Sequence, residues 1–182
     1  LWFPAQYRGR IFGLFLIIKG MGLQDPLKIG LIMAVPYLIA TICMVLWSRH
    51  SDKTGERVWH CAGPLALACV GLACSAYAGS PLLAMISLTF AAIGLYCSQP
   101  VFWAMPTAYL TGVAAAGGIA FINSVGNLGG FVGPFAVGWL KDHFGSFQAG
   151  LLFLALCLLT GSIVSVVVGR SVARLRTTEQ PA

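Results

Sequence analysis

The stretch GGIAFINSVGNLGGFVGP, Gly117–Pro134, lies inside a run of eighty residues, Cys61–Leu140, that contains no Asp, Glu, Lys or Arg. Of the 182 residues in the chain, 58% are hydrophobic and 9% are charged. The mean hydropathy is +0.86. A soluble domain usually carries about 25% charged residues. This deficit indicates that lipid, not water, surrounds most of the chain.

The uncharged run is long enough for several membrane spans, because about 20 helical residues cross a hydrocarbon core. Gly and Pro divide it at Gly79–Pro81 and again near Pro106–Gly112. With the apolar segments on either side, the predicted spans are about Ile29–Ser48, Cys61–Ala78, Leu82–Met105, Val113–Leu140 and Phe147–Gly169. The predicted fold class is an all-α, polytopic membrane protein with about five transmembrane helices.

Three regions follow from these spans. Residues 29–170 are expected to form the transmembrane helix bundle, and residues 171–182 a cytoplasmic tail. Residues 1–28 are expected to form a loop with a short apolar stub, Ile11–Ile18, which cannot cross a bilayer as a straight helix.

Basic residues gather in two segments, one between the first two spans and one after the last: Arg49, Lys53 and Arg57, then Arg170, Arg174 and Arg176. Because basic loops stay cytoplasmic, we expect Arg49–His60 and the C-terminal tail on the cytoplasmic side. Gly79–Pro81 and Lys141–Ser146 are then outside. This topology explains the net charge of +6 without a nucleic-acid partner, and it predicts a multi-pass protein of the cell inner (plasma) membrane.

No pattern of enzyme or metal chemistry stands out. The six cysteines form no C-x-x-C pair, and the three histidines have no ligand spacing. Paired carboxylates, a Ser-His set and a phosphate loop are also missing. We therefore expect no metal, no cofactor and no enzymatic activity.

The opening stretch has two unlike faces when it is drawn as a helix. From Asn123, Asn127 lies about 40° away and Gly130 about 20° away at 100° per residue. The opposite side is bulky and apolar, with Phe121, Val125, Leu128, Phe131, Val132 and Phe135. The glycines Gly126, Gly129, Gly130 and Gly133 have the four-residue spacing of close helix packing. The polar face therefore has two interpretations, a packing seam or the lining of a polar cavity.

A second patch, Tyr96–Gly112, combines aromatic residues with prolines. Pro100 removes a backbone donor, and Pro106 is expected to end the helix. Trp103 lies between these two prolines and could be an interfacial aromatic or could equally face a cavity. Tyr37, which follows Pro36 in the first span, raises the same possibility.

The loop SRHSDKTGER, Ser48–Arg57, is a charged segment between two apolar spans. Gly55 suits a tight turn between two spans, and Asp52 could cap a helix N-terminus. Lys53 and Arg57 could pair with Asp52 or with lipid phosphate.

This loop resembles the short-loop motif G-x-x-x-D-[RK]-x-G-[RK]-[RK] of the major facilitator superfamily. Asp52, Lys53, Gly55 and Arg57 match the motif, whereas Ser48 and Glu56 depart from it. Together with FWAMPTAYLTG, AAAGGIAFINSVGNLGGFVGP and GWLKD, the sequence resembles the anion:cation symporter family over about Gly22–Arg170. Members of that family move small organic anions such as tartrate, sugar acids and aromatic acids.

The resemblance implies that the spans correspond to helices eight to twelve, part of the C-terminal six-helix bundle. The segment LWFPAQYRGRIFGLFL resembles the connection from helix four into helix five, and IIKGMGL resembles the end of helix seven. We therefore expect a truncated chain with an internal deletion that lacks most of the N-terminal half. Transporters of this class bind substrate between two repeats. Proton-coupling carboxylates are expected mainly in the other half, so one half alone is not expected to transport.

The resemblance also suggests residue roles. Asn123 matches a cavity-facing amide of the family, and Trp103 matches an aromatic beside the bound anion. Asn127, which could also serve packing, and Tyr37 are further substrate-binding candidates. Asp52, Lys53, Gly55 and Arg57 would form a conformational loop motif, and the four glycines would serve helix packing. The implied function is secondary, proton-coupled transport of small organic anions, with the anion, the proton, membrane lipid and the missing N-terminal half as partners. The alternative is a non-transporting membrane protein that assembles through its glycine-rich seam.

Overall fold

The computed structural model describes residues 25–179, which form five helices and no strand. The helices are α2 (Pro26–Thr54), α3 (Val58–Ala76), α4 (Pro81–Tyr109), α5 (Gly112–Phe144) and α6 (Gln148–Glu179). All five are long and apolar enough to cross a membrane. The predicted fold class, an all-α membrane protein with about five transmembrane helices, is confirmed. The stub Ile11–Ile18 lies outside the described residues.

Local caps, not the edges of the apolar runs, decide where the helices end. The Asp25 side chain caps α2 by accepting a hydrogen bond from Leu27 N–H at 3.0 Å. At its other end, α2 continues past the apolar run to Gly55, which has φ +67° and donates to Ser51 O at 3.0 Å. Gly145 ends α5 in the same left-handed way, with φ +69°. A left-handed glycine is a common helix terminator, so both helices extend beyond their predicted spans.

The expectation that Pro106 ends a helix is wrong. α4 passes through both Pro100 and Pro106 and ends at Tyr109, and the Leu110 N–H bonds to Pro106 O at 2.9 Å. A proline removes one backbone donor but keeps its carbonyl acceptor, and the carbonyl of Pro106 closes the last turn of α4. The chain turns instead at Leu110 and Thr111, which are both extended.

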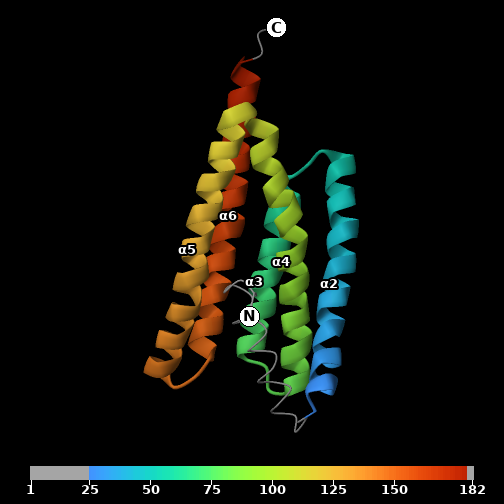
Figure 1. The fold of residues 1–182 in the computed structure, drawn as a ribbon, viewed down its shortest axis with the longest axis vertical. Coiled ribbons are helices and arrows are strands. Elements are labelled where there is room, and N and C mark those ends of the chain that lie inside the picture. Colours follow the sequence, from blue (N-terminus) through green and yellow to red (C-terminus); the bar gives the residue numbers. More distant parts are fainter. Residues whose placement is uncertain (1–24, 180–182) are drawn as a thin grey trace.

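Successive helices run antiparallel (Figure 1). The loop between α2 and α3, the turn between α4 and α5 and the end of α6 lie at one end of the bundle, and the other two turns lie at the opposite end. The two basic segments therefore share one end, as their charges predict. Which end faces the cytoplasm stays a prediction.

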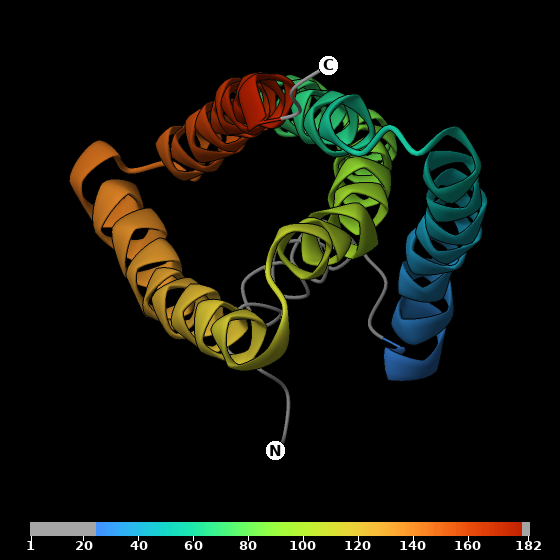
Figure 2. The same ribbon diagram turned by 90° about the horizontal axis from the view of Figure 1, so that it is seen from above.

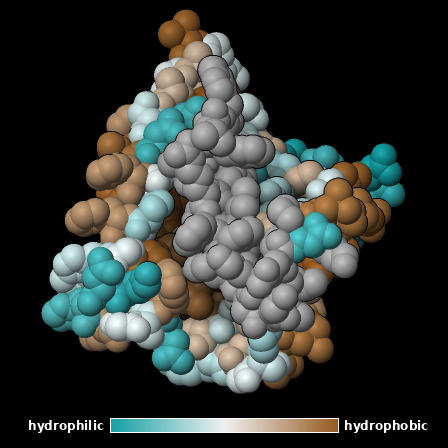
Figure 3. Space-filling model, turned by 60° about the horizontal axis from the view of Figure 1, so that its bottom comes forward, coloured by the Kyte–Doolittle hydropathy of each residue, from teal (hydrophilic) through white to brown (hydrophobic). Residues whose placement is uncertain are grey.

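Seen from above, α4 lies between α2 and α5, and α6 lies beside α3 (Figure 2). α3 packs against α4 and α6, while α2 packs against α4. α5 contacts α6 and touches α4 near the turn that joins them. On the face drawn in Figure 3, hydrophobic side chains lie over the outer flanks of the bundle. Such outward apolar side chains, for example Val70 and Phe90, suit contact with lipid.

The core consists of small residues that let α3 and α4 approach closely. A Cβ at Gly94 would lie 2.7 Å from Ala68 N, and a Cβ at Gly71 would lie 2.6 Å from Ala91 N. Both contacts are with the backbone of the facing helix. Helices associate in lipid through such close packing, because lipid supplies no hydrophobic force between them.

α3 and α6 are joined by polar contacts as well. Ser162 Oγ donates a hydrogen bond to Ala62 O at 2.8 Å, and Cys61 Sγ lies 3.8 Å from Ser165 Oγ. A Cβ at Gly169 would overlap the side chain of Val58. α3 is therefore held on two sides, by α4 and by α6.

Replacing Gly94 with Val should destabilise the bundle, because the new side chain overlaps the backbone of α3. Overpacking of a core typically costs about 1–3 kcal/mol. We expect a lower unfolding temperature and a lower folded yield for G94V, measured in detergent by thermal unfolding and size-exclusion chromatography. G129A is the control, since no heavy atom lies within 4 Å of a Cβ at that position. Equal stability of G94V and wild type would contradict the proposed packing of α3 on α4.

Candidate functional site

The two amides of α5 lie on a helix that is open along its length. Asn123 and Asn127 are both exposed, and α5 contains no buried residue. Its close contacts are near the first turn, where a Cβ at Gly118 would meet Leu110, and near the last, where Gly150 of α6 approaches Val137. The middle of α5, which carries both amides, is therefore left open by the described residues.

The four glycines of α5, Gly126, Gly129, Gly130 and Gly133, also face open space. No heavy atom lies within 4 Å of a Cβ built at any of them. No described helix packs on these glycines, so their packing role stays a prediction that needs a partner beyond residues 25–179.

The close helix contact of this bundle lies elsewhere, and the sequence analysis did not single it out. Along α3, the buried positions are small and follow one another at alternating intervals of three and four: Cys61, Pro64, Ala68, Gly71 and Ser75. Along α4, the buried positions include Ala84, Ala91, Gly94, Ser98 and Val101 at compatible intervals. A heptad-like repeat of small residues is the signal that predicts this interface.

The other two predicted anion contacts are half-buried and belong to other helices. The Tyr37 ring of α2 meets the Tyr96 ring of α4 edge-on, with centroids 6.0 Å apart. Trp103 of α4 lies edge-on to its neighbour Phe102, at 5.5 Å. Because α2 and α5 lie on opposite sides of α4 (Figure 2), the structure does not bring Tyr37 together with the asparagines.

The loop between α2 and α3 contains all four residues of the predicted loop motif. Gly55 forms the turn, and Asp52 pairs with Arg57, with Arg57 Nη2 lying 3.5 Å from Asp52 Oδ1. Lys53 is exposed. Asp52 lies in the last turn of α2 and is itself largely exposed, so it does not cap α3.

Glu56, which departs from the family motif, is the residue that caps α3. Its carboxylate accepts hydrogen bonds from Trp59 N–H at 2.8 Å and from His60 N–H at 3.2 Å. His60 Nδ1 lies 2.8 Å from the same carboxylate. A carboxylate just before an apolar helix is a known capping signal, and it could have been recognised from the sequence.

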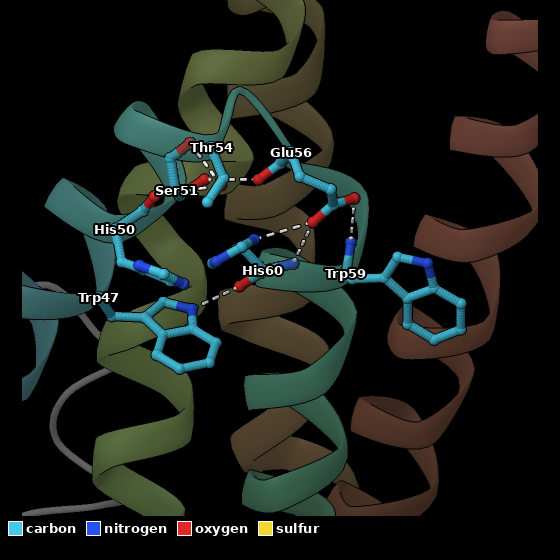
Figure 4. A network of polar contacts seen from close by, with 7 residues as sticks. All are labelled: Trp47, His50, Ser51, Thr54, Glu56, Trp59 and His60. Atoms are coloured by element: carbon cyan, nitrogen blue, oxygen red, sulfur yellow. Dashed lines mark hydrogen bonds and ion pairs between the residues drawn. The ribbon is translucent and has the colours of Figure 1, made fainter.

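Side chains from both helices complete this network (Figure 4). Trp47 Nε1 donates to His60 O at 2.8 Å, and the buried Ser51 Oγ donates to Glu56 O at 2.9 Å. The rings of Trp47 and His60 lie 5.1 Å apart, as do those of His50 and His60. The end of α2 and the start of α3 are thus fastened together, and the sequence analysis missed Trp47, Glu56 and His60.

The environment of Glu56 lowers its pKa. Partial burial is the largest single influence and raises the pKa, but the hydrogen bonds from Trp59 and His60 together outweigh it. The net pKa of Glu56 lies below its ordinary value of 4.5. A lowered pKa means that Glu56 stabilises the fold above its unfolded-state pKa, and that this contribution is lost as the pH falls through its folded-state pKa.

Replacing Glu56 with Ala should remove the cap of α3 and lower the free energy of unfolding by about 1 kcal/mol, a typical value for a lost cap. The difference between wild type and E56A should shrink as the pH falls below 4.5. Thermal unfolding in detergent, followed by circular dichroism across this pH range, measures both effects. The control is D52N, which breaks only an exposed ion pair and should cost less. A pH-independent difference, or a larger loss in D52N, would contradict the capping role.

Comparison with known proteins identifies the family. The sequence model of the Major Facilitator Superfamily matches residues 10–181. A protein named putative tartrate transporter from Agrobacterium vitis is 54% identical over 155 residues, which are 85% of this chain and 36% of that protein. The quinolone resistance transporter of Acinetobacter baumannii is 39% identical over 177 residues, 97% of this chain and 38% of that protein. The inner membrane transport protein RhmT of Escherichia coli (strain K12) is 39% identical over 156 residues, 85% of this chain and 36% of that protein.

The chain spans little more than a third of the length of these curated relatives. No solved structure matches it. The five apolar helices of residues 25–179 and the bacterial relatives make it a multi-pass protein of the cell inner (plasma) membrane. Because the family match covers nearly every residue, the chain belongs to the major facilitator superfamily.

Proposed function

We propose that this chain is part of a secondary transporter of small organic anions and that α5 supplies the amides that contact the anion. One observation carries the proposal: α5 has the length to cross the membrane, yet buries no residue and displays Asn123 and Asn127 one turn apart. The similarity to a protein named putative tartrate transporter supports an anionic carboxylate as the substrate class.

The two amides need a polar environment. Neither makes a hydrogen bond within the described residues, and an unpaired amide facing hydrocarbon is costly. Polar side chains inside membranes usually face a bundle interior or a water-filled path. The polar face of α5 therefore suits a water-filled substrate path formed with the remainder of the transporter.

An asparagine amide is chemically suited to a carboxylate. Its NH₂ group donates two hydrogen bonds, and its oxygen can accept one from a substrate hydroxyl. The neighbouring glycines leave room for a bound molecule, since no heavy atom lies within 4 Å of a Cβ at Gly126 or Gly130. Tartrate and sugar acids carry both carboxylates and hydroxyls, which fits this pair of amides.

The remaining partners belong to the same proposal. Trp103 would lie beside the anion from α4, whereas Tyr37 belongs to α2, which α4 separates from α5, and is left out of this anion site. The uncharged run Cys61–Leu140 holds no carboxylate, so proton coupling would use acidic residues elsewhere in the complete transporter. The remaining half of the transporter would form the opposite wall of the path. The alternative, a non-transporting membrane protein that assembles through its glycine-rich seam, is not favoured. The curated relatives are named as transport proteins, and the four glycines meet no described helix.

In a full-length tartrate-transporter relative, replacing the counterpart of Asn123 with Ala should weaken anion uptake. Loss of one hydrogen bond to a charged group costs about 1.5–3 kcal/mol, or roughly tenfold or more in affinity. The matched control is Ser124→Ala, because the Ser124 hydroxyl already donates to Ala120 O within its own helix at 2.9 Å. Gly130→Leu should abolish uptake by filling the space beside the amides. Uptake KM and folded yield are measured for all three variants.

The same measurements separate a substrate contact from a purely structural role. A structural Asn123 would lose folded yield or thermal stability while keeping its KM. An unchanged KM in the Asn123→Ala variant would overturn the assignment of Asn123 to the substrate path.

A further inference from the structure

The basic end of the bundle has a cation and an aromatic side chain in contact on its outer surface. The Arg170 guanidinium of α6 lies over the Trp59 ring of α3, 5.5 Å from the ring centroid. Trp59 is 56% exposed and Arg170 is also exposed. In Figure 4 the Trp59 side chain points away from the Glu56–His60 network and toward α6. The pair is therefore not part of the network that fastens α2 to α3.

Close packing of α3 on α6 holds this pair in place. A Cβ at Gly169 would overlap Val58, so the two helices touch at the residues next to Arg170 and Trp59. The pair lies at the end where the apolar part of each helix stops, since α3 begins at Val58 and Arg170 is followed by Arg174 and Arg176 in the sequence. This is the depth at which tryptophan and arginine side chains meet lipid headgroups.

The charge at this end is predominantly positive. Among the described residues, the ion pairs are Asp52–Arg57 and Glu56–His60, so Arg170 has no carboxylate partner there. Arg174 follows Arg170 by one helical turn in α6, and Arg49 and Lys53 add exposed cations on α2. A cation that is stacked on one side by an indole ring keeps N–H donors for a further partner.

We propose that Arg170 and Trp59 form a binding site for the headgroup of an anionic phospholipid. The phosphate would accept hydrogen bonds from the Arg170 guanidinium, which stacks on the Trp59 ring. The acyl chains would lie along the outer surface of α3 and α6. The occupant is a lipid rather than a protein because the site lies at the boundary of the apolar belt, and Val70 and Ile163, which lie within about 20° of Trp59 and Arg170 on their helices, are exposed and apolar. This site is separate from the proposed anion path, which lies on α5.

The test is lipid retention by the full 182-residue chain in detergent, measured by native mass spectrometry with phosphatidylglycerol and phosphatidylcholine of identical acyl chains. Wild type should retain phosphatidylglycerol in preference to phosphatidylcholine. R170Q should lose about fivefold of the phosphatidylglycerol affinity, the effect of one cationic side chain near anionic lipid. R170K keeps the charge but not the planar guanidinium, so it should keep a phosphatidylglycerol preference that lies between those of wild type and R170Q. Circular dichroism checks that each variant is folded.

K141Q is the matched control, because Lys141 lies 4.7 Å from the Phe147 ring centroid, a similar contact at the opposite end, but is followed by Asp142. It should leave phosphatidylglycerol retention unchanged. Excess glycerol phosphate, which has a similar phosphate without acyl chains, should not displace the lipid. Unchanged retention in R170Q, equal losses in K141Q and R170Q, loss of the preference in R170K, or displacement by glycerol phosphate would each overturn the proposal.

Discussion

Backbone contact between α3 and α4 is the interaction on which the rest of this bundle depends. In lipid, helices gain little by hiding apolar side chains from each other, so association relies on close packing. The facing positions of α3 and α4 are small, and Gly71 and Gly94 let each backbone approach the other helix. α2 then packs on α4, and α6 packs on α3. Four helices are thus organised around one close contact.

α5 does not share in this packing, and that difference has functional meaning. It is as long and apolar as a membrane span, yet it buries no residue, and the glycines in its middle meet no neighbouring atom. A helix with a bulky apolar face and a small polar face can meet lipid on one side and a solvated path on the other. The packed helices α3, α4 and α6 would then serve as the frame that holds α5 at the edge of that path.

Much of the fold could be predicted from the sequence, because the membrane class depends on composition. The uncharged run and its Gly and Pro divisions were enough to predict the helices. The ends of the helices were harder to predict than the helices themselves. Capping by Gly55, Gly145 and Glu56 sets these ends, whereas the length of the apolar run does not. Pro106 gave a wrong end for α4, because a proline removes a donor but its carbonyl still accepts the Leu110 N–H that closes the last turn.

The candidate site was predictable only in part. Helical periodicity alone placed Asn123 and Asn127 on one face of α5. It also predicted a packing role for the glycines of α5, which meet no described helix. The glycines that do pack, Gly71 and Gly94, lie in less conspicuous repeats of Ala, Cys and Ser. The resemblance placed Tyr37 with the asparagines, but Tyr37 belongs to α2, and α4 separates α2 from α5 (Figure 2).

The most direct test of this account is the water accessibility of α5 in a full-length tartrate-transporter relative whose native cysteines have been removed. Cysteine is placed at the counterparts of Asn123 and Phe121, which lie about 160° apart around the helix. A water-soluble maleimide should label the Asn123 position, and tartrate should slow that labelling. The Phe121 position should resist labelling with or without tartrate. Equal labelling of both positions, or labelling at Asn123 that tartrate does not affect, would contradict the claim that the amide face of α5 lines the substrate path.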